Sequence, residues 1–350
     1  MSNSVPIKPP ESIGANRNLV RRPVFTIGIA GVLLIGVLIL PLPMDGRGWS
    51  NVFDLAHAPS FLGMFLIVAR ILDPATLGLR SRSLSSRSAL QLVALAVGLG
   101  LLGVAAELAQ DLVGRNPSAI DVLANCAGLF AGLLLCLSRS IRFWGLRVAL
   151  QAFSALTVLM PSISPLLELH ECLLQQREFP LLASFERPRE LNIWNPHAAV
   201  VSLSNDWSTH GRQSMKIEAT AGSRYPGATL FEPIQDWSAF DSVELDLRNP
   251  GSRTLEVGIS ITDEQHPESG YAASDRFQDK FNVAPDSILT VQIDLSEVAA
   301  APKDRQLLLH RIRAVNVFLL EKAPGEVLYV DHLRLTRRRL PEQAKTEHRP

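Results

Sequence analysis

Four ionisable residues lie near the ends of long apolar segments, and their chemical types could support acid–base chemistry. They are Asp54, His57, Glu107 and Asp121. A charged group inside a membrane segment costs free energy, so such residues suggest function by default. A histidine beside a carboxylate can transfer protons to or from a substrate. The sequence therefore predicts a polar pocket if the segments that carry these residues meet at one end of a bundle.

Polar neighbours extend this set of residues. Gln110 lies three residues after Glu107, and Asn125 lies on the same helical face as Asp121. Arg115 and Ser118 occupy the connection between segments 89–110 and 119–137. An arginine there could hold a phosphate or carboxylate, such as the phosphate of a polyprenyl carrier or a phospholipid headgroup. A structural alternative stays open: Glu107 and Arg115 could form a helix-to-loop ion pair, and Asn125 could join two helices by a hydrogen bond.

Five apolar segments must position these side chains, each close to the roughly 20 residues that cross a bilayer. They are residues 24–43, 52–72, 89–110, 119–137 and about 143–163. The first has no small-residue cleavage motif after it, so we interpret it as an uncleaved span. The fifth contains Arg147 and Gln151, and Pro161 and Pro165 close it, so a helix lying on the membrane surface is an alternative for it.

Basic residues in the connections predict the orientation of the spans, because cytoplasmic loops carry more Lys and Arg. Basic residues are frequent before the first span, between the second and third, and between the fourth and fifth, whereas the other connections offer only Arg47 and Arg115. The pattern predicts a multi-pass inner-membrane protein with a cytoplasmic N-terminus and a C-terminal half outside. If the fifth segment does not cross, the C-terminal half would be cytoplasmic.

The polar residues in this spacing resemble a known family. The pattern consists of Asp54-x-x-His57, Glu107-x-x-Gln110 and Arg115-x-x-Ser118-x-x-Asp121-x-x-x-Asn125-x-x-Gly128. Over roughly residues 25–140 this pattern resembles the VanZ-like membrane family, which is named for low-level resistance to the glycopeptide teicoplanin. The resemblance implies a role in the cell envelope and marks the polar residues of the pattern as the positions shared with the family.

The C-terminal half has a different composition, which predicts a separate water-soluble domain. Residues 181–350 hold most of the Asp, Glu, Lys and Tyr, and the whole chain balances 34 basic against 34 acidic residues. Zero net charge gives no electrostatic case for a nucleic-acid partner. The three cysteines, Cys126, Cys136 and Cys172, form neither a disulfide framework nor a zinc-site spacing. The soluble domain must therefore be stabilised by its apolar core.

Alternating apolar residues in this half predict an all-β fold. Residues 242–248, 254–262, 288–295 and 327–335 alternate with period two and are separated by turn-forming residues. The predicted chain is thus multi-domain, an α-helical transmembrane bundle followed by an all-β jelly-roll sandwich. We expect a cytoplasmic tail at 1–22, the membrane domain at 23–165, a linker at 166–180, the sandwich at 181–336 and a disordered tail at 337–350.

Several short motifs of this half are similar to galactose-binding-like jelly-roll carbohydrate-binding modules. They include Ser184-Phe185-Glu186, Tyr225-Pro226-Gly227, Asp275-Arg276-Phe277 and Tyr329-Val330-Asp331. Sugar binding uses flat aromatic faces and polar side chains. The candidates for ligand contact are Trp194, Trp207, Tyr225, Trp237, Tyr271 and Arg276. Core packing is the alternative for each aromatic residue, above all for Trp237. The resemblance also implies a structural calcium ion, with Glu186 and Asp331 at the matching places.

Three functions are compatible with these patterns. The first is a VanZ-like envelope protein that displays a glycan-binding module on the outer side and handles envelope polysaccharides or glycoconjugates. The second is a membrane enzyme that acts on a lipid-linked substrate at the polar pocket. The third is a non-catalytic receptor or scaffold. The expected partners are membrane lipids together with a glycan or lipid-linked saccharide.

Overall fold

The computed structural model describes residues 47–72, 86–110, 118–220, 225–320 and 324–337. The chain forms two compact units, Met1–Leu169 and His170–Pro350. The predicted cytoplasmic tail at 1–22 and the predicted first span at 24–43 lie outside the described residues, as does the tail from residue 338.

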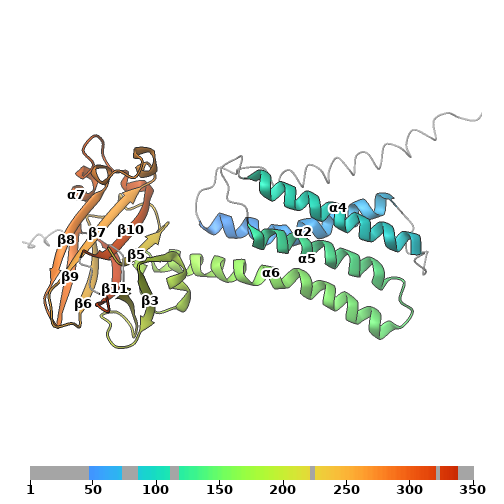
Figure 1. The fold of residues 1–350 in the computed structure, drawn as a ribbon, viewed down its shortest axis with the longest axis horizontal. Coiled ribbons are helices and arrows are strands. Elements are labelled where there is room, and N and C mark those ends of the chain that lie inside the picture. The colour runs from blue at the N-terminus through green and yellow to red at the C-terminus, as the bar shows by residue number, and fades with distance from the viewer. Residues whose placement is uncertain (1–46, 73–85, 111–117, 221–224, 321–323, 338–350) are drawn as a thin grey trace, which may run out of the picture. The chain divides into compact units, whose positions relative to one another are not determined.

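The first unit is built from long apolar helices (Figure 1). They are α2 (Arg47–Leu72), α4 (Ser86–Gln110), α5 (Ala119–Ser138) and α6 (Trp144–Glu178). Within the described residues, these four helices are long and apolar enough to cross a membrane. They correspond to the second to fifth predicted spans.

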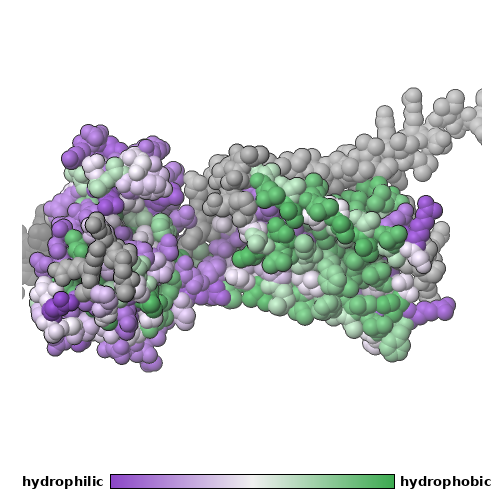
Figure 2. All heavy atoms as spheres, viewed as in Figure 1, coloured by the Kyte–Doolittle hydropathy of each residue, from purple (hydrophilic) through white to green (hydrophobic). Residues whose placement is uncertain are grey.

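The outer surface of this unit is apolar, as a lipid-facing surface must be. Leu90, Leu101 and Ile120 are 70%, 67% and 70% exposed. Figure 2 shows hydrophobic residues over the helices and mainly hydrophilic or neutral residues over the sandwich. A water-soluble protein seldom exposes so large an apolar surface, which supports a membrane location for the first unit.

Helix α6 corrects the predicted linker at 166–180. The helix continues through Pro161 and Pro165 and ends at Glu178. The sequence predicts that the prolines end the helix, because proline lacks the N–H group of the i to i−4 hydrogen bond. Membrane helices nevertheless tolerate proline, because neighbouring helices, Ser and Thr side chains and local adjustments of the backbone can satisfy the freed carbonyls. Most of the predicted linker is therefore helical.

Small residues set the distance between α2 and α5. A Cβ atom added to Gly128 would lie 2.2 Å from the carbonyl oxygen of Ala58, and one added to Gly132 would lie 2.5 Å from the ring of Phe65. Gly103 of α4 faces Phe61 in a similar way, with a distance of 3.0 Å. Glycine thus allows the helix backbones to approach closely, a common basis of helix association in lipid.

The second unit is an antiparallel sandwich of two sheets with the jelly-roll arrangement (Figure 1). One sheet has the strand order β3-β4-β11-β6-β9 with β1 paired to β11, and the other has the order β2-β5-β10-β7-β8. The strands are β1 (Leu181–Ala183), β2 (Trp194–His197), β3 (Ala199–Ser204), β4 (Ser214–Ala219), β5 (Gly227–Phe231), β6 (Ser242–Asn249), β7 (Leu255–Asp263), β8 (Phe277–Val283), β9 (Ser287–Asp294), β10 (Ile312–Leu319) and β11 (Val327–Thr336).

The core of the sandwich lies between the two sheets. The alternation that predicted strands at 254–262 places Val257, Ile259 and Ile261 of β7 in this core, each at most 1% exposed. The predicted strands at 242–248, 288–295 and 327–335 correspond to β6, β9 and β11. Because alternate residues point to opposite faces, the outward positions of each strand are free to form a binding surface.

The glycine contact between α2 and α5 leads to a first prediction. Gly128→Ala should destabilise the membrane unit by about 1–3 kcal/mol, because the new methyl group must push two backbones apart. The measurement is the temperature at which detergent-solubilised protein loses its monodisperse peak in size-exclusion chromatography. Gly98→Ala in α4 is the matched control, because no atom lies within 4 Å of the added Cβ. Equal midpoints for the two variants would contradict the packing described here.

Candidate functional site

The predicted polar residues meet at one end of the helix bundle. His57 of α2 is fully buried, and its Nδ1 lies 3.0 Å from Asn125 Oδ1 of α5. The other ring nitrogen, Nε2, lies 3.8 Å from Asp121 Oδ2, and Nδ1 lies 4.0 Å from Glu107 Oε1 of α4. Three helices therefore contribute to one buried cluster, as the spacing of the residues predicts.

Hydrogen bonds hold the acidic members of this cluster. Gln110 Nε2 donates to Glu107 Oε1 at 3.0 Å, and the backbone N–H of Ser118 donates to Glu107 Oε2 at 3.4 Å. Ser118 is also the N-cap of α5, where its hydroxyl accepts from the backbone N–H of Asp121. Capping fixes where α5 begins, and therefore places Asp121 in its first turn.

Asp54 completes the group, one helical turn before His57. One potential ligand atom each from Asp54, His57 and Asp121 lies within 4.8 Å of the other two. Arg115, which we expect beside the cluster, lies outside the described residues. Seven of the eight predicted polar positions are thus in the described structure, where they contact one another or lie one helical turn apart. Their chemical role stays a prediction.

A second candidate site is a pocket of about 480 Å³ on the sandwich. It is lined by His197, Tyr225, Ala273, Arg276, Gln278, Asn316 and Phe318. These residues belong to β2, β8 and β10 or to the segments that lead into β5 and β8, so the pocket lies on the outward face of the β2-β5-β10-β7-β8 sheet. Tyr225 and Arg276 are the two predicted ligand residues that the structure brings together here.

Two glycines shape the floor of this pocket. Phe318 of β10 pairs in register with Gly227 of β5 on one side and Gly258 of β7 on the other. A Cβ atom at Gly258 would lie 2.4 Å from the Phe318 ring, and one at Gly227 would lie 2.6 Å from Phe318 Cα. The ring therefore lies over the β7 backbone, and the Tyr225 ring meets it edge-on at 5.7 Å between centroids.

The polar rim of the pocket has unused hydrogen-bonding capacity. Among the described residues, Arg276 Nε and Asn316 Oδ1 are buried without a hydrogen-bond partner. Arg276 also donates from Nη2 to Gln278 Oε1 at 2.6 Å, which fixes the direction of the guanidinium group. Burial lowers the pKa of His197, so its imidazole is neutral near pH 7 and can both donate and accept. The pocket thus offers aromatic surface together with oriented polar groups.

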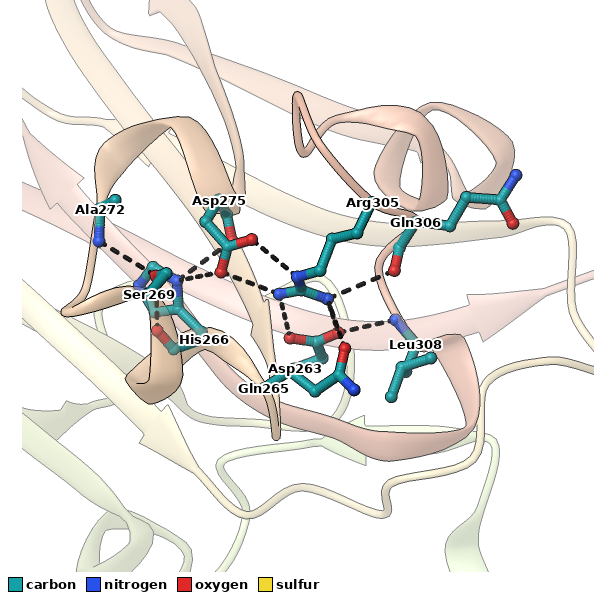
Figure 3. Close-up of polar contacts among 9 residues, drawn as sticks. All are labelled: Asp263, Gln265, His266, Ser269, Ala272, Asp275, Arg305, Gln306 and Leu308. Atoms are coloured by element: carbon teal, nitrogen blue, oxygen red, sulfur yellow. Dashed lines mark hydrogen bonds and ion pairs between the residues drawn. The ribbon is translucent and has the colours of Figure 1, made fainter.

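A partly buried ion-pair network anchors the loop that carries part of this rim (Figure 3). The Arg305 guanidinium lies between Asp263 at the end of β7 and Asp275 just before β8. His266 Nδ1 lies 3.3 Å from Asp275 Oδ2, and the ring of His266 meets Tyr271 edge-on. Because Asp275 immediately precedes Arg276, this network also holds the backbone of Arg276 at the pocket.

The same network changes the ionisation of its members. The hydrogen bond from Arg305 lowers the pKa of Asp275 to about 2. The hydrogen bond to Asp263 contributes most to raising the pKa of Arg305 above its usual value. Both groups therefore stay charged over the physiological range, and the loop keeps one arrangement.

The three predicted tryptophan contacts are wrong in this structure. Trp194, Trp207 and Trp237 are 3%, 8% and 0% exposed, so none presents a ring face to a ligand. Trp237 donates its indole N–H to the Ile234 carbonyl oxygen and packs in the core. Tyr271 is 67% exposed but does not line the pocket. Trp194 and Trp237 belong to the core between the sheets, whereas Trp207 packs against Tyr329, as expected for large aromatic side chains that bury much apolar area.

The two residues expected to bind calcium instead hold a loop in place. Glu186 Oε1 accepts two backbone N–H groups at 2.7 Å, and Asp331 Oδ2 accepts two more at 2.6 and 2.8 Å, all from residues 209–213. The calcium implied by the resemblance stays a prediction, and no step depends on it.

Sequence reasoning missed five residues of the pocket: His197, Ala273, Gln278, Asn316 and Phe318. Asn316 and Phe318 are outward positions of β10, whose inward positions Val315 and Val317 are in the core. The alternation of Val315, Asn316 and Val317 was the signal that could have found Asn316, whereas the apolar neighbours of Phe318 hide its outward position.

Comparison with known proteins identifies no family for the chain. No family model and no curated protein matches it. Among solved structures, it is similar to an exo-β-agarase, with 16% identity and a TM-score of 0.36, over 46% of this chain and 25% of the agarase. It is also similar to the family 11 carbohydrate-binding module from Clostridium thermocellum, with 18% identity and a TM-score of 0.34, over 45% of this chain and 94% of the module.

A third similarity is to the CBM22-1 xylan-binding domain of Paenibacillus barcinonensis Xyn10C, with 14% identity and a TM-score of 0.31. It covers 45% of this chain and 96% of that domain. The helices and sheets of the chain itself define a class of protein, one with apolar helices long enough to cross a membrane and a jelly-roll sandwich.

Removing Arg305 should destabilise the sandwich strongly. Arg305→Met leaves the fully buried Asp263 carboxylate without its ion-pair partner, which costs about 3–5 kcal/mol in comparable cases. The measurement is urea unfolding of the full chain in micelles, followed by near-ultraviolet circular dichroism. Arg248→Met is the matched control, since its partner Asp286 is 80% exposed and such surface pairs contribute about 0–1 kcal/mol. A similar loss for both variants would argue against the network as the anchor.

The low pKa of Asp275 predicts how acid affects the network. A carboxyl group whose pKa is about 2 when folded and near 3.8 when unfolded stabilises the fold above pH 4, and this stabilisation is lost as the pH falls through 2. Asp275→Asn should therefore lower the melting temperature at pH 5, and the difference from wild type should shrink towards pH 2. Melting curves between pH 2 and pH 6 measure this. A difference that stays constant with pH would refute the assignment.

Proposed function

We propose that this protein is a membrane-anchored glycan-binding protein of the cell envelope. The observation that carries the proposal is the pocket on the outward sheet face of the sandwich, where two aromatic rings lie beside buried polar atoms that have no partner among the described residues. Pockets of about 300–1,000 Å³ that combine apolar surface with a few oriented polar groups are typical of small-ligand sites.

The aromatic part of the pocket suits a sugar ring. Tyr225 is 48% exposed, and its ring stands edge-on to Phe318. Phe318 is only 5% exposed and supports the Tyr225 ring from beside it, so the Tyr225 ring can contact the C–H face of a pyranose, while its hydroxyl can reach a sugar hydroxyl. Tyr225 also has a φ of 60°, in the left-handed region that favours glycine. Strained residues of this kind often occur at ligand-binding positions.

The polar part of the pocket suits sugar hydroxyls. Arg276 Nε is a donor, Asn316 Oδ1 is an acceptor, and the neutral His197 ring can act as either. A hydroxyl group both donates and accepts, so it can satisfy adjacent groups of both kinds. Leaving such buried groups unsatisfied costs about 1–3 kcal/mol each, which a bound glycan would recover.

The location and the family form part of the same proposal. The apolar helices support an inner-membrane protein, and the basic connections favour a cytoplasmic N-terminus with the sandwich outside. The buried cluster around His57 supports the VanZ-like resemblance and a role in handling envelope polysaccharides or glycoconjugates. A reporter that is active only in the cytoplasm, fused after residue 340, tests the orientation: its activity there would refute the outer location.

The buried cluster favours a second candidate function, chemistry on a lipid-linked substrate. At one end of the helix bundle, the His57 imidazole lies 4.0 Å from the Glu107 carboxylate and 3.8 Å from the Asp121 carboxylate. Such a set can bind or transfer protons. Loss of turnover of a lipid-linked saccharide by Glu107→Gln, with glycan binding unchanged, would support this function independently of the sandwich.

Glycan binding is predicted to depend on the pocket residues. The full chain in lipid nanodiscs, which avoid sugar-headed detergents, should bind a subset of an oligosaccharide array. Tyr225→Ala and Arg276→Ala should each weaken binding at least about tenfold, the effect of losing roughly 1.4 kcal/mol of contact. Isothermal titration with the oligosaccharide that gives the strongest array signal measures the change.

Two matched controls lie on the opposite sheet. Ile288→Ala removes an exposed apolar side chain from β9, and Arg248→Ala removes an arginine from β6. Both should keep wild-type affinity. If the pocket variants bind like wild type while these controls lose binding, the ligand occupies the other face and the pocket proposal fails.

A further inference from the structure

The Nε2 atom of His57 lies in the interior of the membrane unit. It is buried in a residue that is 0% exposed, and it has no hydrogen-bond partner among the described residues. Its nearest ion-pair contact is Asp121 Oδ2, at 3.8 Å. A buried nitrogen without a partner costs free energy, so the position needs an explanation.

The other ring nitrogen determines what Nε2 can do. Nδ1 lies 3.0 Å from Asn125 Oδ1, and an amide oxygen can only accept a hydrogen bond. Nδ1 therefore carries the proton, and Nε2 of the neutral ring has a free lone pair. Metal-binding histidines commonly show this arrangement, in which one nitrogen donates to an oxygen and the other faces the metal.

Carboxylates face the same point. Asp54 precedes His57 by one helical turn on α2, and Asp121 lies in the first turn of α5. One ligand atom from each of the three residues lies within 4.8 Å of the others. Ligand atoms around a tetrahedral Zn²⁺ are about 3.3 Å apart, as follows from bond lengths of roughly 2.0–2.1 Å. Rotations of the aspartate side chains can bring their carboxylate oxygens from within 4.8 Å to this shorter distance.

Charge also favours a cation at this point. Asp121 is 7% exposed and Glu107 is 2% exposed, and for the described part of the chain His57 is the ion-pair partner of both. Burying carboxylates in an apolar bundle is costly unless positive charge compensates them. A bound divalent cation supplies two positive charges, so no Lys or Arg side chain is needed to compensate the carboxylates.

We infer that Asp54, His57 and Asp121 form a divalent-cation site of the zinc type at one end of the helix bundle. His57 binds through Nε2, and the aspartates bind through carboxylate oxygens. Asn125 orients the histidine ring from behind. Imidazole nitrogen favours Zn²⁺ over Mg²⁺ and Ca²⁺, which prefer oxygen ligands alone. Three protein ligands leave one position open for water or for an anionic oxygen of a ligand. The site does not depend on glycan binding by the sandwich.

The test measures metal content of the full chain in nanodiscs. The protein is stripped with a chelator, exposed to ZnCl₂, freed of unbound metal and analysed by mass spectrometry. We expect about one tightly bound Zn²⁺ per chain, the content of a mononuclear site. His57→Gln and Asp121→Asn should each lower the occupancy at least about tenfold. Asn125→Leu removes only the orienting contact and should weaken Zn²⁺ binding by about 10–100-fold.

A control localises the metal. His210 and His332 stack on each other in the sandwich, and His332 lies 3.5 Å from Asp246, so they offer a competing site. The double variant His210→Gln, His332→Gln should keep the bound Zn²⁺. Loss of Zn²⁺ from this variant, with retention by His57→Gln, would overturn the proposal.

Two further results decide the remaining cases. Wild-type protein that holds no Zn²⁺ under these conditions overturns the proposal and leaves His57 as an ion-pair partner of Asp121. Variants that do not give a monodisperse peak in size-exclusion chromatography are replaced by Asp54→Asn, which keeps the shape of the side chain and should also lower Zn²⁺ occupancy. Full occupancy in a well-folded Asp54→Asn protein would count against the site.

Discussion

The close approach of α5 to α2 at Gly128 is the contact on which the polar cluster depends. The α-carbon of Gly128 faces the carbonyl of Ala58, with no room for a side chain. His57 is the residue before Ala58, and Asn125 lies one turn before Gly128, so the approach of the two backbones brings the imidazole within 3.0 Å of the amide. In lipid, helices gain little from burying apolar surface, and close packing of small residues replaces that driving force.

The sandwich uses the same device for a different purpose. Gly227 and Gly258 lie on either side of Phe318 in adjacent strands, and side chains there would clash with β10 or with its phenyl ring. The absence of two side chains opens the pocket and lets an outward phenylalanine lie across the sheet. The Phe318 ring packs against Gly258 and is only 5% exposed. In both units, glycines therefore determine where a side chain of the candidate site lies: His57 in the bundle and Phe318 in the sandwich.

The membrane unit could be predicted from sequence more completely than the pocket. Span length and the spacing of His57, Glu107 and Asp121 were enough to predict one polar cluster, because helical periodicity fixes which residues share a face. The linker prediction failed because Pro165 does not end α6. The strands β6, β7, β9 and β11 followed from their alternation, whereas β10 was missed. Its outward Phe318 is nearly as buried as its inward neighbours, so hydrophobicity alone does not separate the two faces.

The two units treat their buried carboxylates differently. In the sandwich, Asp263 is fully buried and accepts from Arg305 and from the backbone N–H of Leu308, so its charge is compensated within the fold. Asp331 is likewise occupied by N–H groups of the neighbouring loop. Asp121 in the bundle has only a more distant contact with His57 among the described ion pairs. A carboxylate that is satisfied internally serves stability, because nothing is gained by further contacts. A carboxylate that is buried but loosely paired retains the capacity to bind something else. By this criterion, the proposed cation site lies at the end of the helix bundle, and the proposed ligand pocket of the sandwich combines aromatic and polar groups, Arg276 among them.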